Sequence, residues 1–121
     1  MATIKEKVIK VFQNRIGSGF LREEIIDLVV KDYSETNRAS VIPSDYCYNM
    51  VNDGINFDFH IFESLGEGRY RCLGPNHCYT GAIYWKGESV GEWKDGRYRL
   101  RQNAPSNLIR RIEVDQWIEP R

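Results

Sequence analysis

Four polar residues in the middle of the chain have side chains suited to reading DNA bases. Pro43 begins a predicted helix that extends to about Gly54, and residues four apart lie on the same face of a helix. The asparagine amide can form two hydrogen bonds with the edge of adenine. We therefore predict major-groove contacts from the exposed face formed by Ser44, Tyr48, Asn49 and Asn52. The alternative is that these residues only keep a short helix soluble.

Two further pairs of residues are candidates for contacts with the DNA backbone. Arg69 and Arg71 lie in a strand predicted over residues 69–72, and side chains two apart point to the same face of a strand. Guanidinium groups match phosphate oxygens and also enter narrow minor grooves. Asn37 and Arg38 lie in the loop that precedes the helix predicted to begin at Pro43. We predict that these four residues contact the backbone or the minor groove.

Aromatic residues in the second half of the chain form another candidate site. Several aromatic rings close together in space can enclose an extruded base or stack on successive bases. Aromatic residues are also favoured in strands, so the same rings could build the core of a small sheet. We expect at least one of the two tryptophans Trp85 and Trp93 to be a core residue. The candidate pocket residues are Tyr84, Trp85, Trp93 and Tyr98.

Few residues could bind a metal ion or act as a nucleophile. Structural zinc sites use closely paired ligands such as Cys-x-x-Cys, and the chain has no such pair. His77 directly precedes Cys78, but adjacent side chains of an extended chain point apart. We therefore predict no metal, no cofactor and no catalytic residue, so the protein is not expected to be an enzyme.

Composition and charge limit the classes of function. The chain has 121 residues, of which 41% are hydrophobic, and it holds 17 basic and 17 acidic residues. The zero net charge argues against a tight non-specific DNA binder. No apolar run is long enough to span a bilayer, the N-terminal residues resemble a helix more than a secretory signal, and three cysteines suit a reducing compartment. We expect a cytoplasmic protein with no membrane contact.

The hydrophobic pattern predicts an α+β fold. Apolar residues at helical spacing indicate helices over about residues 4–16 and 23–33, and the third helix follows. A hairpin over residues 57–72 comes next, so the order is that of a winged helix-turn-helix. Three short strands, at residues 79–85, 90–93 and 97–100, then predict an appended β-meander. We predict one domain, residues 1–121, with a winged-helix core at 1–74 and a meander and tail at 75–121. The tail could be helix or strand.

Three motifs carry a resemblance to a known family: Asn37-Arg38 with Ser40 to Asn49, then Gly68-Arg69-Tyr70, then Tyr84 to Gly87. Together they resemble an uncharacterised bacterial winged-helix family, similar to modules found beside restriction endonucleases and other defence nucleases. The resemblance covers residues 20–100. It implies a DNA-recognition module of bacterial or phage origin, and it implies no catalytic residues.

The expected function is therefore double-stranded DNA binding, as a recognition module or small regulator. Two alternatives remain open at this point. The first is a protein-interaction module that uses the same scaffold with a nuclease or regulator as partner. The second is a reader of modified bases, which requires a concave aromatic pocket beside a basic groove.

Overall fold

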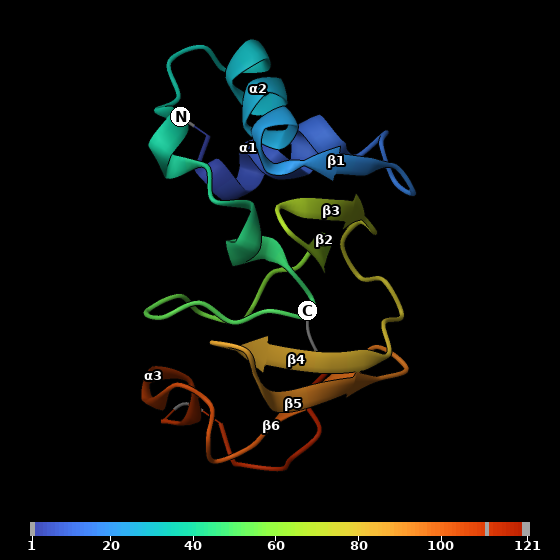
Figure 1. Ribbon diagram of the computed structural model, residues 1–121, viewed down its shortest axis with the longest axis vertical. Coiled ribbons are helices and arrows are strands. Elements are labelled where there is room, and N and C mark those ends of the chain that lie inside the picture. Colours follow the sequence, from blue (N-terminus) through green and yellow to red (C-terminus); the bar gives the residue numbers. More distant parts are fainter. Residues whose placement is uncertain (1, 111, 120–121) are drawn as a thin grey trace.

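The computed structural model describes residues 2–110 and 112–119 of the chain. Figure 1 shows two layers stacked along the long axis, with α1, α2 and one sheet at one end and the second sheet with α3 at the other. Among the described residues, no helix has the length and apolar character needed to cross a membrane. The elements are α1 (Ile4–Phe12), β1 (Gly19–Leu21), α2 (Arg22–Asp32), the 3₁₀ helices η1 (Arg38–Ser40) and η2 (Pro43–Tyr46), β2 (Phe62–Gly66), β3 (Arg69–Cys72), β4 (Gly81–Trp85), β5 (Glu88–Lys94), β6 (Arg97–Leu100) and α3 (Ser106–Ile109).

The first two predicted helices are present, with different ends. Thr3 and Glu6 form a reciprocal capping box at the start of α1, which satisfies two backbone N–H groups. The helix ends at Phe12, short of the predicted residue 16. At the start of α2, the Leu21 N–H donates to the Glu24 carboxylate, which is the contribution that an acidic residue makes to a capping box. Leu21 itself has no side-chain acceptor for the first N–H groups of the helix.

The predicted winged helix-turn-helix is wrong, because the third helix does not form. Only Pro43–Tyr46 is helical, as a short 3₁₀ turn, and the following residues are extended. Cys47 forms a parallel bridge with Phe62, and Met50 forms one with Tyr84. These pairings with both sheets satisfy backbone groups that a helix would have used internally. The fold is instead two three-stranded antiparallel sheets with a few short helices.

Each sheet has a simple topology. The first has the strand order β1–β3–β2, so β1 pairs with the hairpin that β2 and β3 form. The second sheet is the predicted meander, with the order β4–β5–β6. Its turns place Lys86-Gly87 and Asp95-Gly96 at positive φ, as two-residue hairpin turns require.

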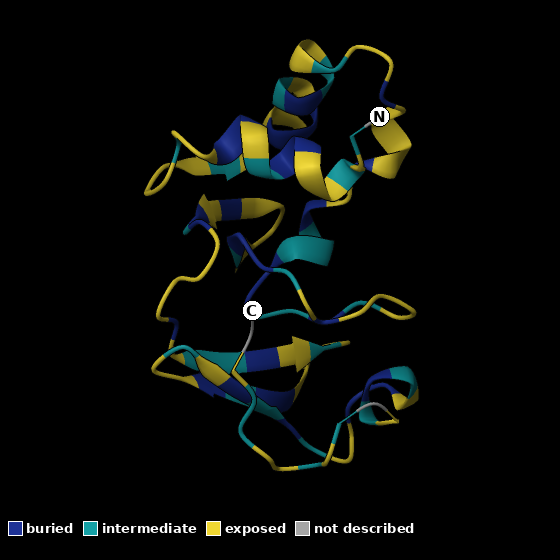
Figure 2. Ribbon diagram, turned by 180° about the vertical axis from the view of Figure 1, so that it is seen from behind, coloured by how far each residue is buried: buried dark blue, intermediate teal, exposed yellow. Residues whose placement is uncertain are grey.

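The buried hydrophobic residues form two clusters. Figure 2 colours the backbone of buried residues dark blue. One joins α1 and α2 to the inner face of the first sheet. The other lies on the second sheet and includes Tyr48, Val51 and Phe57, which precede that sheet by many residues. The tail, left open as helix or strand, forms the short α3 and a single antiparallel bridge between Tyr98 and Ile118.

Candidate nucleic-acid interface

The two arginines of β3 lie on one exposed face, as the alternating pattern predicted. Arg69 and Arg71 are exposed, whereas Tyr70 and Cys72 between and after them are buried. Figure 2 shows this alternation along the strand. The inward residues pack in the first core, which fixes the strand orientation and holds both guanidinium groups on the outside. No ion pair involving either arginine occurs within the described part of the chain.

The hairpin register determines what surrounds the arginines. Leu21 of β1 is the cross-strand partner of Arg69, and Glu63 of β2 is the partner of Arg71. Directly opposite residues in a sheet point to the same face. The Glu63 carboxylate accepts a hydrogen bond of 2.7 Å from the Tyr79 hydroxyl, so it also holds the segment after β3. Burial first, and then this bond to Glu63, raise the pKa of Tyr79.

Exposed leucines lie beside Arg69. Leu21 is 51% exposed and Leu65 is 50% exposed. Both border a hollow of about 300 Å³, together with Gly19, Phe20, Glu24, Arg69 and Tyr70. The face therefore combines two cations, the carboxylates of Glu63 and Glu24, and apolar surface, a combination that suits a macromolecular partner. Sequence reasoning missed both leucines, although their position in strands with buried neighbours was a usable signal.

The loop residues predicted to contact the DNA backbone have internal partners. The Asn37 side chain accepts a hydrogen bond from the Ala39 N–H and caps η1. Arg38 forms ion pairs of 2.7 Å with Asp27 and 2.9 Å with Glu23, both on α2. The bond to Asp27, more than the bond to Glu23, raises the pKa of Arg38. A phosphate would have to compete with two carboxylates for this guanidinium group.

The predicted base-reading residues do not share an exposed helical face. The Asn52 amide donates to Ser44 Oγ at 2.8 Å and to Asp45 Oδ1 at 2.7 Å. The Asn49 amide exchanges two hydrogen bonds of 2.9 Å with the backbone of Ser64, next to the bridge between Cys47 and Phe62. These amides hold the extended segment against η2 and β2, so their position explains the fold of this segment without a ligand.

Tyr48, the fourth predicted base-reading residue, is only 2% exposed. Its hydroxyl donates to the Gly74 carbonyl at 2.6 Å and accepts from the His77 N–H at 2.9 Å. Burial is the main cause that raises its pKa. The Trp93 indole N–H donates to the Tyr48 carbonyl at 2.6 Å. Tyr48 therefore connects the extended segment to residues 74–77, which lie between β3 and β4, and to the second core.

The four predicted pocket aromatics do not line one pocket. Trp93 is 1% exposed and Tyr98 is buried, so the expectation that at least one tryptophan belongs to the core is confirmed. Trp85 is half-buried, its indole N–H donates to Asp53, and Lys86 lies over its ring. Tyr84 is exposed on the outside of β4. Of the four, Tyr98 and Trp85 border separate hollows.

One buried histidine has a function in the fold that the sequence did not indicate. His60 Nδ1 donates to the Cys47 carbonyl at 3.1 Å, and its Nε2 is buried without a hydrogen-bond partner in the described structure. The ring packs among Phe57, Trp93 and Tyr48. Burial lowers the pKa of His60 to about 4, so the ring is neutral at physiological pH.

The cysteines show no arrangement for metal or redox chemistry within the described residues. Cys47 and Cys72 are buried and Cys78 is exposed, and all three are free thiols. Burial raises the pKa of Cys47 and of Cys72, which disfavours the reactive thiolate form. No group of three or more His, Cys, Asp or Glu side chains suited to a metal occurs in the described ranges. The expected absence of a metal and of catalysis stays a prediction.

The fold and the exposed hairpin define a small two-sheet domain with a mixed basic and apolar face. The chain belongs to the family described as "Domain of unknown function (DUF7225)", which matches residues 3–100. It is also similar to "Uncharacterized protein YnaC" of Bacillus subtilis (strain 168), with 37% identity over 111 residues. The match covers 87% of this chain but only 42% of that protein, so the chain spans less than half the length of its relative. No solved structure matches the chain.

Proposed function

We propose that this domain binds double-stranded DNA through the outer face of the β1–β3–β2 sheet. The observation that supports the proposal is the pair of exposed guanidinium groups of Arg69 and Arg71 on one face of β3. Residues two apart in a strand are separated by about 7 Å, so the groups can contact successive groups of a phosphate backbone.

The proposed contact is mainly with the backbone. Base reading by Asn49 and Asn52 is not part of it, because both amides have partners inside the protein. Two arginines would release about two counterions, which gives modest affinity and a moderate dependence on salt. This agrees with the zero net charge of the chain. The domain itself would carry out no catalysis.

The cellular setting belongs to the same proposal. The resemblance to modules beside restriction and defence nucleases suggests that the domain brings a nuclease or regulator to DNA in a bacterial or phage setting, in the cytoplasm. The greater length of YnaC is consistent with a module that is joined to further sequence in some relatives. The partner activity would then lie outside residues 3–100.

The proposal is tested by fluorescence anisotropy with a labelled random-sequence duplex at low salt. Replacing both Arg69 and Arg71 by Ala should weaken binding about tenfold or more, because each arginine forms charge-assisted contacts with phosphate. The matched control replaces Lys10 and Lys31, two exposed cations of α1 and α2, by Ala. Equal losses in both double variants would indicate general electrostatic attraction and contradict a site on β3.

A protein partner is the second candidate, and the exposed leucines favour it. Leu21 and Leu65 border the same hollow as Arg69, and arginine with apolar surface is typical of protein interfaces. Replacing both leucines by Ser separates the two functions. Protein docking should be lost, whereas phosphate contacts of Arg69 and Arg71 should be largely kept. Loss of duplex binding in the leucine variant would show that the apolar surface is part of the DNA contact.

A further inference from the structure

The outer face of the second sheet, opposite its core, is defined by the register of β4, β5 and β6 (Figure 1). Tyr98 and Leu100 of β6 are buried, so Arg97 and Arg99, which alternate with them, lie on the outer face. Residues directly opposite each other in neighbouring strands share a face. Lys94 of β5 is the cross-strand partner of Arg97. The outer face therefore has three cations on two adjacent strands.

The pairing of Lys94 with Arg97 is unfavourable for the fold itself, because like charges directly opposite each other destabilise a sheet. Both side chains are exposed, and neither forms an ion pair with any residue that the structure describes, including Asp95 in the turn between them. Arg99, in contrast, donates to its cross-strand partner Glu92 at 2.8 Å. The domain thus holds two unneutralised cations side by side, as a surface that binds an anionic partner requires.

The C-terminal segment positions one of these cations. Ile118 forms an antiparallel bridge with Tyr98 at the edge of β6. Beside this bridge, the guanidinium groups of Arg97 and Arg99 lie over the Trp117 ring, 5.7 and 4.8 Å from its centroid. A guanidinium group stacked on a ring is held by the cation–π attraction and keeps the N–H groups of its edge available for phosphate oxygens. Arg97 is therefore pre-positioned for an anion.

An accessible aromatic ring lies on the same face. Tyr84 of β4 is 46% exposed, whereas Ile83 before it is buried, so the Tyr84 side chain lies on the outer face. Its cross-strand partner Ser89 accepts a hydrogen bond of 3.4 Å from the guanidinium group of Arg101, which follows β6. One row across the sheet thus contains an exposed ring and a cation. Cations along a surface with accessible rings are typical of proteins that bind single-stranded nucleic acids.

We infer that the outer face of the second sheet binds single-stranded DNA. Phosphates would contact Lys94, Arg97 and Arg101, and an unpaired base would stack on Tyr84. A duplex offers the same phosphates but keeps its bases paired and stacked, so the accessible ring favours a single strand. Only the choice of DNA over RNA rests on the DNA binding proposed above for the first sheet.

Fluorescence anisotropy with a labelled oligothymidine of about twelve nucleotides tests the inference at low salt. Replacing both Lys94 and Arg97 by Ala should weaken binding about tenfold or more. It should also flatten the plot of log binding constant against log salt by about 1.4, at about 0.7 per phosphate contact of a single strand. The matched control, in which Lys10 and Lys31 are replaced by Ala, should keep the affinity and the slope.

The ring is tested separately from the cations. Tyr84→Ser should weaken oligothymidine binding about tenfold, because the stacking surface is lost, whereas Tyr84→Phe should keep the affinity. Equal affinities of the Ser and Phe variants would contradict a base contact at Tyr84.

Lys94→Glu distinguishes a lost contact from a damaged fold. The new carboxylate would lie opposite Arg97 as a complementary charge, so the melting temperature should rise while oligothymidine binding becomes weaker than in Lys94→Ala. Unchanged binding in Lys94→Glu would contradict a phosphate contact at this position.

Two further measurements separate this inference from the proposed function. Replacing Arg69 and Arg71 by Ala should weaken duplex binding and leave oligothymidine binding in place. Oligothymidine binding without any duplex binding would contradict only the proposed function of the first sheet. Absence of oligothymidine binding, equal losses in the Lys94/Arg97 and Lys10/Lys31 variants, or tighter binding of an oligouridine of the same length would overturn the inference.

Discussion

Acidification should destabilise this protein through one buried histidine. In the unfolded chain His60 has a pKa of 6.5, and in the folded chain burial lowers it to about 4. Between these values the unfolded chain binds a proton that the folded chain does not bind. The effect of His60 on the unfolding free energy is therefore most favourable above pH 6.5, where the ring is neutral in both states. The unfolding free energy decreases as the pH falls from 6.5 toward 4. Below pH 4 both states are protonated and the effect is constant.

The size of the effect follows from the pKa difference. One proton over about 2.5 pH units corresponds to about 3 kcal/mol of unfolding free energy at 25 °C. Mesophilic domains have about 5–15 kcal/mol in total, so the loss should be large enough to measure. Its physical cause is the removal of water around a cation that would sit among Phe57, Trp93 and Tyr48.

Urea unfolding at a series of pH values between about 7 and 4 measures this effect. His60→Asn is the informative variant, because its amide can still donate to the Cys47 carbonyl but cannot titrate. Its unfolding free energy should fall less steeply with acid than that of the unchanged protein, whatever its absolute stability. His77→Asn, at the exposed histidine, is the control and should keep the original slope. Equal slopes in the unchanged protein and in His60→Asn would refute the reasoning.

Two further predictions concern packing and hydrogen bonding, and a third concerns metal content. Trp93→Ala should cost about 3–5 kcal/mol of unfolding free energy, and Trp85→Ala clearly less, because only Trp93 is fully enclosed; thermal and urea unfolding compare them. Asn49→Ala should cost about 1–2 kcal/mol through its two bonds to Ser64 while duplex affinity stays unchanged, and a loss of affinity at unchanged stability would restore the base-reading role. Elemental analysis should find no stoichiometric zinc, and a chelator should leave the melting temperature unchanged; one zinc per chain would contradict this.

The parts of the fold that the sequence predicted correctly are those that local patterns determine. The alternation in β3 and the strands of the meander depend on neighbouring residues, and both were predicted. The start of the first helix at Ile4 is equally local. A repeat of two, or a helical spacing of three and four, is sufficient information for such elements.

The third helix was predicted wrongly because distant residues decide its conformation. The apolar and polar positions after Pro43 fit a helix, but Tyr48 and Val51 donate their N–H groups to Phe62 and Tyr84. These partners lie 14 and 33 residues further along the chain. The spacing of residues within the segment contains no information on these distant partners. The polar side chains that were predicted on an exposed helical face therefore form hydrogen bonds inside the protein.

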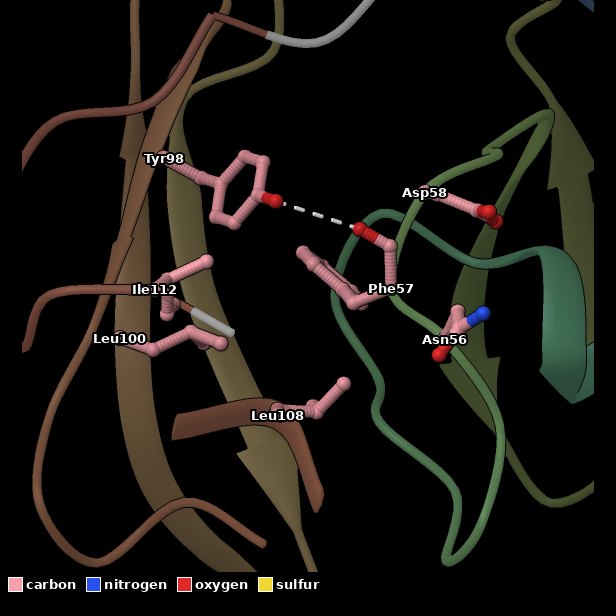
Figure 3. Close-up of a pocket in the computed structure, with 7 residues that line it drawn as sticks. All are labelled: Asn56, Phe57, Asp58, Tyr98, Leu100, Leu108 and Ile112. Carbon is pink, nitrogen blue, oxygen red and sulfur yellow. Dashed lines mark hydrogen bonds between the residues drawn. The ribbon is translucent and has the colours of Figure 1, made fainter. Parts of the chain in front are cut away.

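The candidate sites divide in the same way. Arg69 and Arg71 were found because a strand alone determines their common face. The hollow that Phe57, Tyr98 and Leu108 border (Figure 3) was not predicted, because these residues come from a loop, a strand and a helix that meet only in the folded protein. The predicted aromatic pocket does not form, because rings that are close in sequence lie on different sides of one sheet.

The salt dependence of duplex binding tests the central claim most directly. The logarithm of the binding constant should fall linearly with the logarithm of the salt concentration, and replacing Arg69 and Arg71 by Ala should flatten the slope by about two, at about 0.9 per phosphate contact. The control in which Lys10 and Lys31 are replaced should keep the original slope. A slope that is the same in the protein with and without the β3 arginines would contradict a DNA-binding face on this sheet.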